Sequence, residues 1–492
     1  MGRALKSDSR VLLGAGTLAL AALLGGCVVD QAREVGKYRA VLDDRAGKPK
    51  ALEPGETLDL GRALALANAD NEQLASQGEN YLQALISKNR AFAAFLPTVS
   101  FQPNFTAEQA PKGNGAEAAP GAPSESAAAA AASSGGYVQR GQVLERLEAP
   151  VVGAMNFTYR SVPLYQSAKL EVVQQRQLLL DAQATILLNV AQAYYQVLTS
   201  TRQVKVLEHS LELQRARVRD LEGRFNVHLA LALDVAQAKA NEAASRVQLS
   251  QAENDARNGR RTLALLIGAP AVDGPLISAT IVTDDPRTAA DYVAHALAAR
   301  PDLLAAQTAV KEAKEAVDAA VAEYYPSVSL NVAAYLYREN YANASKWDGI
   351  LLANLPLFSA GTIHDDVRQA WSQVRKAALA ESYLRREVQQ GVETAYDNRV
   401  TSDIELAELQ REVQASSDAY QQAVQQEKNG LAIPLDVLTA QDTLLNSQLQ
   451  YASEAYARTI FQLDLIRAVG DLGPGTPAAL HWSPSESVPP TP

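Results

Sequence analysis

The sequence predicts a mainly helical fold in which one order of helices and strands occurs twice. First, residues 202 positions apart match in a single register over about eighty residues, so that Leu229–Ala238 aligns with Leu431–Ala440 and Gly268 with Gly470. Second, each half contains two short segments with alternating apolar and polar residues, as expected of strands with one apolar face. Third, a proline marks each helix–strand junction, where it ends the preceding element. We therefore expect a mainly α chain with two strand pairs, built by internal duplication.

The first repeat is predicted to span residues 57–270. Its long helix has apolar residues at alternating spacings of four and three, the periodicity of a coiled coil, with Gln214 as the polar exception. An Ala-, Gly-, Pro- and Ser-rich segment, 107–136, reads as a flexible hairpin loop between the strands. The expected elements are helices 58–67 and 74–95, strands 98–106 and 151–160, a helix of about 60 residues from Ser167, and a helix at 233–266.

The second repeat, residues 288–471, follows a connector at 271–287 and has the same order of elements. A Pro-rich tail, 472–492, completes the sequence and is expected to be disordered. The expected elements of this repeat are helices 289–299 and 302–324, strands 327–337 and 347–357, and helices 363–427 and 435–469.

The first 26 residues read as a signal peptide. A basic start is followed by the apolar run Val11–Leu24, which is too short for a permanent membrane span. Leu24-Gly25-Gly26-Cys27 then resembles a bacterial lipobox, which implies cleavage before Cys27 and attachment of lipid to it. The alternative is an ordinary signal peptide with an incidental cysteine, but the only cysteine of the chain stands at the cleavage point. Residues 27–56 are then a lipidated, irregular tether.

Composition argues against several classes of function. The net charge is −10 with no basic stripe, so nucleic acid is not an expected partner. Five scattered histidines and one cysteine cannot build a zinc site, and no cofactor is expected apart from the lipid on Cys27. The sequence has no nucleotide-binding glycine loop, no HExxH motif and no nucleophile elbow, so we predict that the protein is not an enzyme.

A single copy of this chain cannot form a closed structure from the elements that its sequence predicts. Four strands cannot close a membrane barrel, which needs at least eight, and open strand edges are not viable in lipid. In each half, the helix before the strands and the helix after the tip add up to the length of the long helix, about 90 Å, which is too long for one globular core. Two, three or four copies sharing one barrel and one helical tube would resolve both problems.

The chain resembles the TolC-like outer-membrane factors over about 57–471, and its lipobox resembles the OprM-like lipoprotein branch of that family. The motifs that carry the resemblance, besides the order of elements, are Arg300-Pro301-Asp302-Leu303, Pro356-Leu357-Phe358 with Ala360-Gly361, and Gly430 with Asp436-Val437-Leu438. The resemblance implies a homotrimer with a twelve-stranded β-barrel in the outer membrane of a Gram-negative bacterium. It also implies a twelve-helix α-barrel tunnel that continues from the barrel across the periplasm.

The implied function is passive conduction in a tripartite efflux system, with an inner-membrane pump and a periplasmic adaptor as partners. Two alternatives remain open. The chain can instead be the exit duct of a type I protein secretion system, or, in a different class, a periplasmic coiled-coil adaptor or structural lipoprotein. An adaptor would bury the apolar faces of its strands, whereas a channel would turn them to lipid.

The helical tips are the predicted gate and adaptor contact. The resemblance places Asp436 at the periplasmic constriction, with Asp234 nearby, and a ring of carboxylates favours cations. An alternative role for both is that of an acidic residue at a helix N-terminus. The family's tip has an arginine and a second aspartate where this chain has Ala432 and Thr439, so apolar contacts of Leu431 and Ile433 are expected to help closure. The expected adaptor contacts are Gly430, Pro434, Leu229 and Leu231.

Overall fold

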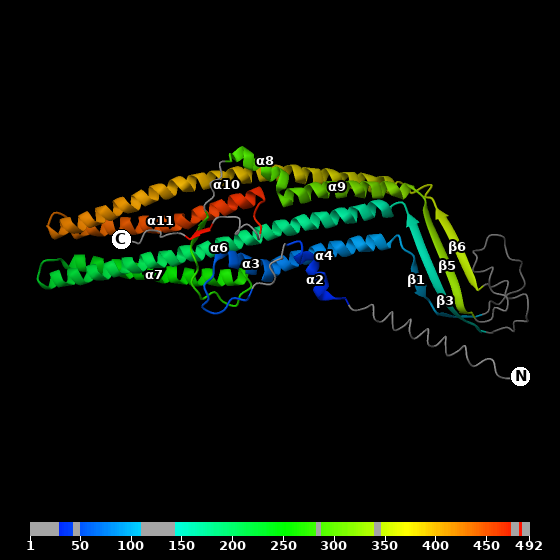
Figure 1. Ribbon diagram of the computed structural model, residues 1–492, viewed down its shortest axis with the longest axis horizontal. Coiled ribbons are helices and arrows are strands. Elements are labelled where there is room, and N and C mark those ends of the chain that lie inside the picture. The colour runs from blue at the N-terminus through cyan, green and yellow to red at the C-terminus, as the bar shows by residue number, and fades with distance from the viewer. Residues whose placement is uncertain are drawn as a thin grey trace, which may run out of the picture. The chain divides into compact units, whose positions relative to one another are not determined.

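The computed structural model describes residues 29–42, 50–109, 143–281, 287–338, 346–473 and 482–484. In these ranges the predicted order of helices and strands occurs twice, as Figure 1 shows. The first half comprises α3 (Leu60–Asp70), α4 (Glu72–Ala93), β1 (Thr98–Phe101), β2 (Asn104–Gln109), β3 (Val143–Thr158), α6 (Ser161–Asn226) and α7 (Ala232–Leu266). The second half comprises α8 (Ala289–Ala299), α9 (Pro301–Val321), the 3₁₀ turn η2 (Ala322–Tyr324), β5 (Ser327–Arg338), β6 (Trp347–Asn354), α10 (Thr362–Lys428) and α11 (Pro434–Val469).

The 202-residue register of the duplication is visible in the packing. Val190 of α6 and Leu263 of α7 lie in one buried apolar cluster, and Val392 of α10 and Leu465 of α11 lie in another. Each pair differs by 202 positions, so the same two seam positions are buried in both halves. No helix in the described ranges combines the length and apolar character needed to cross a membrane.

In each half, two shorter helices meet end to end at a tight junction: the start of α4 meets the end of α7, and the start of α9 meets the end of α11. In the first half, the Asn71 side chain at the start of α4 donates a hydrogen bond to the carbonyl of Leu266 at the end of α7 (2.8 Å). In the second half, Arg300 donates to the carbonyl of Ala468 (3.2 Å) and is held by Asp302, so these two residues of the Arg-Pro-Asp-Leu motif close the junction. These bonds occupy C-terminal helix carbonyls that would otherwise lack partners.

A left-handed glycine lies at each junction. Gly268 (φ +68°) and Gly470 (φ +94°) follow the ends of α7 and α11. A Cβ on Gly268 would lie 2.9 Å from the Asp70 carbonyl oxygen, and one on Gly470 would lie 3.0 Å from the Arg300 Cα. Glycine is therefore required here both by backbone conformation and by the close approach of a second backbone.

We predict that Gly470→Ala destabilises the protein, because alanine in a left-handed conformation costs about 1–2 kcal/mol before the clash is added. The control is Gly391→Ala on α10, where an added Cβ meets no atom within 4 Å and alanine favours the helix. The apparent melting temperature of the detergent-solubilised protein should fall for Gly470→Ala and stay level or rise for Gly391→Ala. Equal melting of both variants would contradict the junction model.

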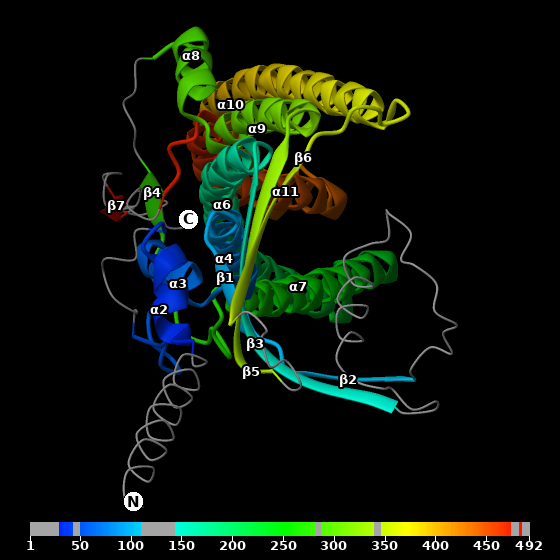
Figure 2. The same cartoon turned by 90° about the vertical axis from the view of Figure 1, so that its right-hand side faces the viewer.

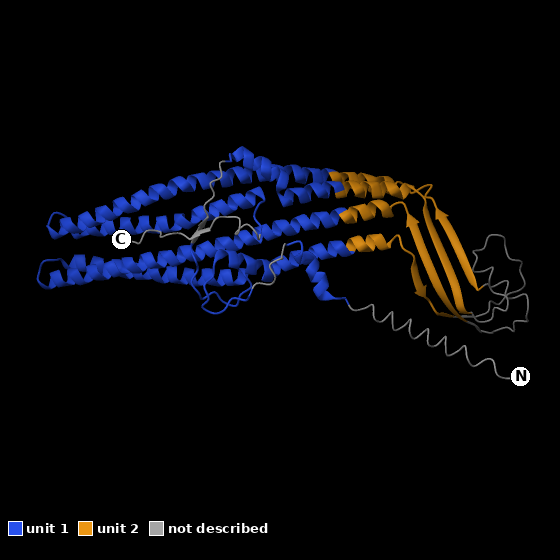
Figure 3. Ribbon diagram, in the orientation of Figure 1, with its two compact units in different colours: residues 1–86, 170–311, 375–492 blue, residues 87–169, 312–374 orange. Residues whose placement is uncertain are grey.

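The chain forms two compact units, each containing segments from both repeats (Figure 3). Unit 1 comprises residues 1–86, 170–311 and 375–492, and holds the buried apolar clusters and the helical tips. Unit 2 comprises residues 87–169 and 312–374 and contains the large sheet with the helix ends that adjoin it.

The sheet of unit 2 is antiparallel with the order β1-β3-β5-β6 (Figures 1 and 2). Residues paired across neighbouring strands project to the same face. One face is apolar and largely exposed, with Leu351 71% exposed. Its residues include Val99, Phe101, Val151, Met155, Phe157, Val328, Leu330, Val332 and Trp347. The other face is mostly polar, with Thr98, Ser100, Asn156, Thr158, Ser327, Ser329 and Asn331, although Ile350 and Leu352 of the edge strand β6 interrupt it.

The strand boundaries correct the sequence prediction. The strand expected at 98–106 is broken after Phe101, and its second part, β2, continues to Gln109, into the segment expected to be a loop. β3 begins eight residues before the expected Val151 and pairs with β2 through Val143–Glu148. The break between β1 and β2 and the register shift between β3 and β5 at Ala149/Pro150 have the same cause. Both lie at prolines, residues 103 and 150, which cannot donate hydrogen bonds to a neighbouring strand. Figure 2 shows β2 and the start of β3 running beyond the other strands.

Smaller corrections concern the helix–strand junctions and the tether. β6 ends at Asn354 rather than residue 357, because Leu355–Gly361 form a loop before α10. The segment expected to be irregular contains the helix α2 (Gln31–Arg39), whose first turn is capped by the Asp30 side chain. The Tyr38 ring of α2 is buried and occupies the space where a Cβ on Gly78 of α4 would lie.

The connector and the tail are also more ordered than expected. β4 (Ala279–Ile281) in the connector pairs with β7 (Trp482–Pro484) in the Pro-rich tail. Backbone pairing between segments about 200 residues apart leaves no local signal. The predicted signal peptide 1–26, the lipidation site Cys27 and residues 110–136 of the predicted loop lie outside the described residues.

Candidate functional site

The tips of the two helical hairpins have the same backbone geometry. α6 turns into α7 through residues 227–231, and α10 turns into α11 through residues 429–433. Leu229 N–H donates to the Arg224 carbonyl and Leu431 N–H to the Gln426 carbonyl, both at 2.8 Å. This 6→1 hydrogen bond is characteristic of a Schellman cap, and it satisfies a carbonyl in the last turn of each long helix.

A histidine occupies the left-handed position in the first tip. Gly430 (φ +73°) follows the end of α10, where the sequence predicts a helix stop because glycine adopts this conformation readily, and its counterpart 202 positions earlier is His228 (φ +61°). Sequence reasoning found Gly430 but missed His228, because histidine gives no stop signal by composition. The fixed register of the duplication was the available clue.

Both predicted gate carboxylates bind the backbone of their own tip. Asp234 accepts a hydrogen bond from the Leu231 N–H (3.1 Å), and Asp436 accepts one from the Ile433 N–H (3.0 Å). Pro434 is the first residue of α11, where a missing N–H costs nothing. Each aspartate thus stabilises a helix start, the alternative role considered for it, and this role leaves its charge at the tip.

The apolar residues of the tips are exposed in a single chain. Leu229 and Leu431 have 77% and 78% of their surface exposed. Leu231 and Ile433, one residue before each outgoing helix, are 67% and 59% exposed. None of these four side chains contributes to a buried cluster of the described chain. The tips therefore present apolar ends that one chain leaves unpartnered.

A buried ion pair joins the two hairpins near the tips. The Glu427 carboxylate of α10 accepts two hydrogen bonds from the Arg217 guanidinium of α6, at 2.5 and 2.6 Å. Arg224, two turns further along α6, adds a third bond at 3.3 Å. The side chains of Glu427 and Arg217 are only 4% and 11% exposed. A bidentate pair with so little solvent fixes α10 against α6 more strongly than a surface pair would.

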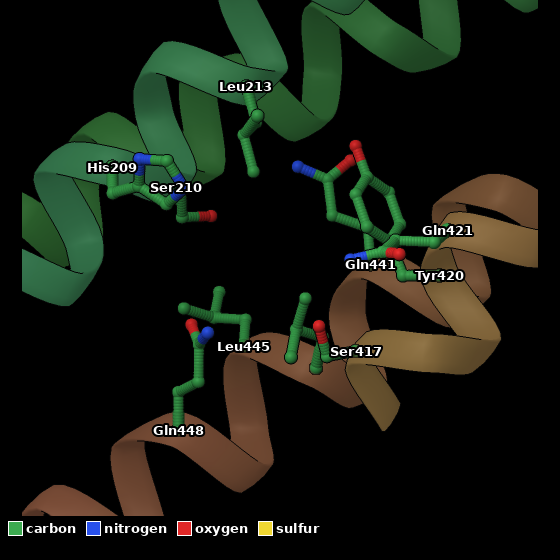
Figure 4. A pocket seen from close by; sticks show the side chains of 10 residues that line it. His209, Ser210, Leu213, Ser417, Tyr420, Gln421, Gln441, Leu445 and Gln448 are labelled. Atoms are coloured by element: carbon green, nitrogen blue, oxygen red, sulfur yellow. The ribbon is translucent and has the colours of Figure 1, made fainter. Parts of the chain in front are cut away.

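A cavity of about 290 Å³ lies beside this ion pair, between α6, α10 and α11. Figure 4 shows the side chains of Ser210, Tyr420 and Gln441 at its wall. Ser210 Oγ and Gln441 Nε2 are buried and have no hydrogen-bond partner among the described residues. Burial raises the pKa of the Tyr420 phenol, the Arg217 charge opposes this rise, and the Glu427 carboxylate adds to it. The region therefore contains polar groups that are incompletely satisfied.

Polar residues interrupt the apolar seam at equivalent positions of both hairpins. Gln214 of α6 is 1% exposed, and its counterpart, Ser416 of α10, is buried and hydrogen-bonded to Ser447 of α11 (2.7 Å between the Oγ atoms). Gln214 was visible as the polar exception in the heptads. Glu427 was not, because a glutamate on a long helix usually indicates a solvated face.

We predict strong energetic coupling between Arg217 and Glu427. Glu427→Ala leaves the buried Arg217 guanidinium without its bidentate partner, and Arg217→Ala leaves Glu427 with only the longer bond from Arg224. Each single variant should therefore lose stability, by up to about 3–5 kcal/mol, the cost of breaking a buried pair. The double variant removes both charges and should melt no lower than the less stable single variant. The matched control is the exposed pair Arg411 and Glu408, worth about 0–1 kcal/mol, whose variants should melt like the parent. Additive losses in the Arg217/Glu427 series would contradict the coupling.

No cluster of three histidine, cysteine, aspartate or glutamate side chains suited to a metal ion occurs among the residues the structure describes.

Comparison with known protein sequences identifies one family. Residues 293–471 match the family model described as "Outer membrane efflux protein". The chain is 24% identical to the outer membrane efflux protein BepC of Brucella suis, over 62% of this chain and 67% of that protein. It is 28% identical to the pyoverdine export outer membrane protein OpmQ of Pseudomonas aeruginosa, over 58% and 61% of the two chains. The matches thus span about two thirds or less of these relatives' lengths.

Solved structures share the fold over most of the chain. The outer membrane protein VceC of Vibrio cholerae superposes with a TM-score of 0.70 at 19% identity, covering 84% of this chain and 96% of that one. The CmeC outer membrane channel of Campylobacter jejuni superposes with a TM-score of 0.71 at 17% identity, covering 84% and 86%. At these identities the structures establish the fold of the single chain, and the prediction of a mainly helical, duplicated chain with two strand pairs is confirmed.

Proposed function

This chain belongs to the TolC-like outer-membrane factors, and from that premise we propose that it is the outer-membrane channel of a tripartite efflux system. The observation that carries the proposal is the sheet of unit 2, whose apolar face is exposed while its opposite face is mostly polar. A soluble adaptor would bury such a face against a second layer. A channel turns it to lipid and its polar face to a water-filled lumen.

The proposed assembly is a homotrimer. Among the residues that the structure describes, β1 and β6 each pair on one side only, and an open edge inside a bilayer would leave backbone groups without partners. Three copies would close a twelve-stranded barrel, continued by a tunnel of twelve helical columns. Relatives named as efflux pump outer membrane proteins, such as TtgC of Pseudomonas putida, support an adaptor and an inner-membrane pump as partners.

The proposed mechanism is passive conduction through a gate at the helical tips. Closure relies on the buried pair Arg217–Glu427, which ties α10 to α6, because Ala432 and Thr439 lack the charged side chains of the family's tip. Thr439 instead donates to the carbonyl of Leu435 within its own helix. Asp436 at each tip adds a ring of carboxylates that favours cations at the entrance. The exposed Leu431 and Ile433 pack at the centre of the closed tips or against the adaptor.

Planar-bilayer recordings of the purified protein test this function. We predict that Glu427→Gln raises conductance, because the amide cannot hold two arginine charges in place, while the exposed Glu408→Gln on the same helix has no effect. Asp436→Ala should instead reduce the preference for cations. Absence of any channel activity in the parent and in Glu427→Gln would refute the channel function. Activity with an unchanged Glu427→Gln would refute only the proposed lock.

A type I protein secretion duct remains the second candidate, because the exported substrate is set largely by the inner-membrane partner. The two functions require the same conduit and differ in the inner-membrane partner. Co-purification of the chain with its adaptor and inner-membrane component would show whether that inner-membrane component is a drug-type pump or a protein exporter.

We also propose that the mature protein is anchored in the outer membrane by lipid on Cys27. The lipobox sequence and the absence of any other cysteine support this. Several acyl chains would add a stable anchor, at about 0.8 kcal/mol per buried CH₂.

Labelling cells with palmitate tests the anchor. The parent protein should incorporate the label and Cys27→Ser should not, while trimers on native gels persist in both. Label retained in Cys27→Ser would place the acylation elsewhere and contradict the proposal.

A further inference from the structure

The loop between β6 and α10, Leu355–Gly361, exposes two large apolar side chains. Leu357 and Phe358 are both 90% exposed, the highest exposure of any large apolar side chain that the structure describes. The duplication makes this exposure unusual. The corresponding segment of the first half is Val162–Tyr165, and there Tyr165 packs on Phe92 and Phe95, with ring centroids 5.9 and 6.0 Å apart.

The loop is held in its outward shape. Ala360 (φ +51°) and Gly361 (φ +87°) are consecutive left-handed residues, and a non-glycine residue rarely adopts this conformation. Thr362 donates to the Ser359 carbonyl through both its N–H (3.0 Å) and its Oγ1 (2.8 Å), and Asp365 N–H donates to the Gly361 carbonyl. Backbone strain combined with exposed apolar side chains indicates a surface shaped for a partner.

The edges of the sheet indicate what that partner is. β6 forms one edge of the sheet and ends at Asn354. β1 forms the other edge and begins at Thr98. The sheet is antiparallel throughout, and β1 of a second copy can extend it antiparallel beside β6. Thr98 of the added strand then lies near Asn354, and the end of its α4 lies beside the Leu355–Gly361 loop.

The end of α4 has a complementary apolar surface. Phe92 and Leu96 remain 50% and 51% exposed although Phe92 already contacts Tyr165. All of these residues belong to unit 2, so the surface is formed within one compact unit.

We propose that Leu357 and Phe358 dock on Phe92 and Leu96 of the next copy and thereby fasten the seam between protomers. This inference rests on the proposed trimer and assigns the side chains that join the copies just outside the strand edges. Each half then has the same aromatic packing at the foot of its strands, within the chain for Tyr165 and between chains for Phe358.

Thiol crosslinking tests the contact. In the full-length protein, Phe92→Cys with Phe358→Cys, treated with a short bis-maleimide, should give covalent dimers and trimers on denaturing gels. Phe92→Cys with Tyr165→Cys is the matched control, because that pair lies within one chain and should crosslink without changing the apparent mass. The parent, which carries only Cys27, and each single variant should remain monomeric on the same gels.

Substitution at Phe358 gives a second readout. Phe358→Ser should lower the fraction of trimer surviving on native gels after mild heating, by roughly tenfold, and Phe358→Leu should restore most of it, because an apolar contact tolerates another apolar side chain. Two outcomes would overturn the contact and favour lipid as the occupant, provided that the parent forms trimers. In the first, Phe92→Cys/Phe358→Cys gives no crosslinks. In the second, Phe358→Ser loses membrane insertion but keeps the trimer. Absence of trimers in the parent would instead refute the proposed assembly itself.

Discussion

The requirement that every backbone N–H and C=O be paired in lipid governs this structure. The sheet of unit 2 has an exposed apolar face, which water disfavours, and two unpaired strand edges, which a bilayer disfavours even more. A single chain cannot resolve both conditions. In the proposed trimer, closure of the sheets into one barrel would remove the edges while keeping the apolar face outward. The duplication follows the same logic, since each repeat supplies one strand pair together with the helices that continue from it.

In the proposed gate, closure at the helical tips depends on a different interaction. Asp234 and Asp436 satisfy backbone N–H groups of their own helices, so they stabilise the shape of each tip without joining the two hairpins. Arg217 and Glu427 join them, with both charges largely removed from water. A buried ion pair is costly to separate, yet once separated both side chains can regain hydration. Such a pair is suited to a gate that remains shut until a partner supplies the energy to open it.

The sequence predicted most of the fold because its signals were local and occurred twice. Helix ends at Gly268, Gly430 and Gly470, and prolines before the strands, mark boundaries that the structure places within a few residues. Failures came where pairing was distant or lacked a local signal. The β4–β7 pair joins residues about 200 positions apart, and β2–β3 pairing continues into a segment whose composition is typical of a loop. At the tips, Asp436 was identified by its motif, whereas Glu427 depends on an arginine from the other repeat.

The junctions at Gly268 and Gly470 also have a mechanical consequence. α6 and α10 run without interruption for 66 and 67 residues, or about 100 Å, while their neighbours are each made of two helices that abut at a glycine. The uninterrupted helices α6 and α10 resist stretching. In the neighbouring columns, a twist between the two abutting helices would not break the hydrogen bonds within either helix. In the proposed tunnel, the close backbone contacts at Gly268 and Gly470 would therefore mark the two places where the helical columns are discontinuous.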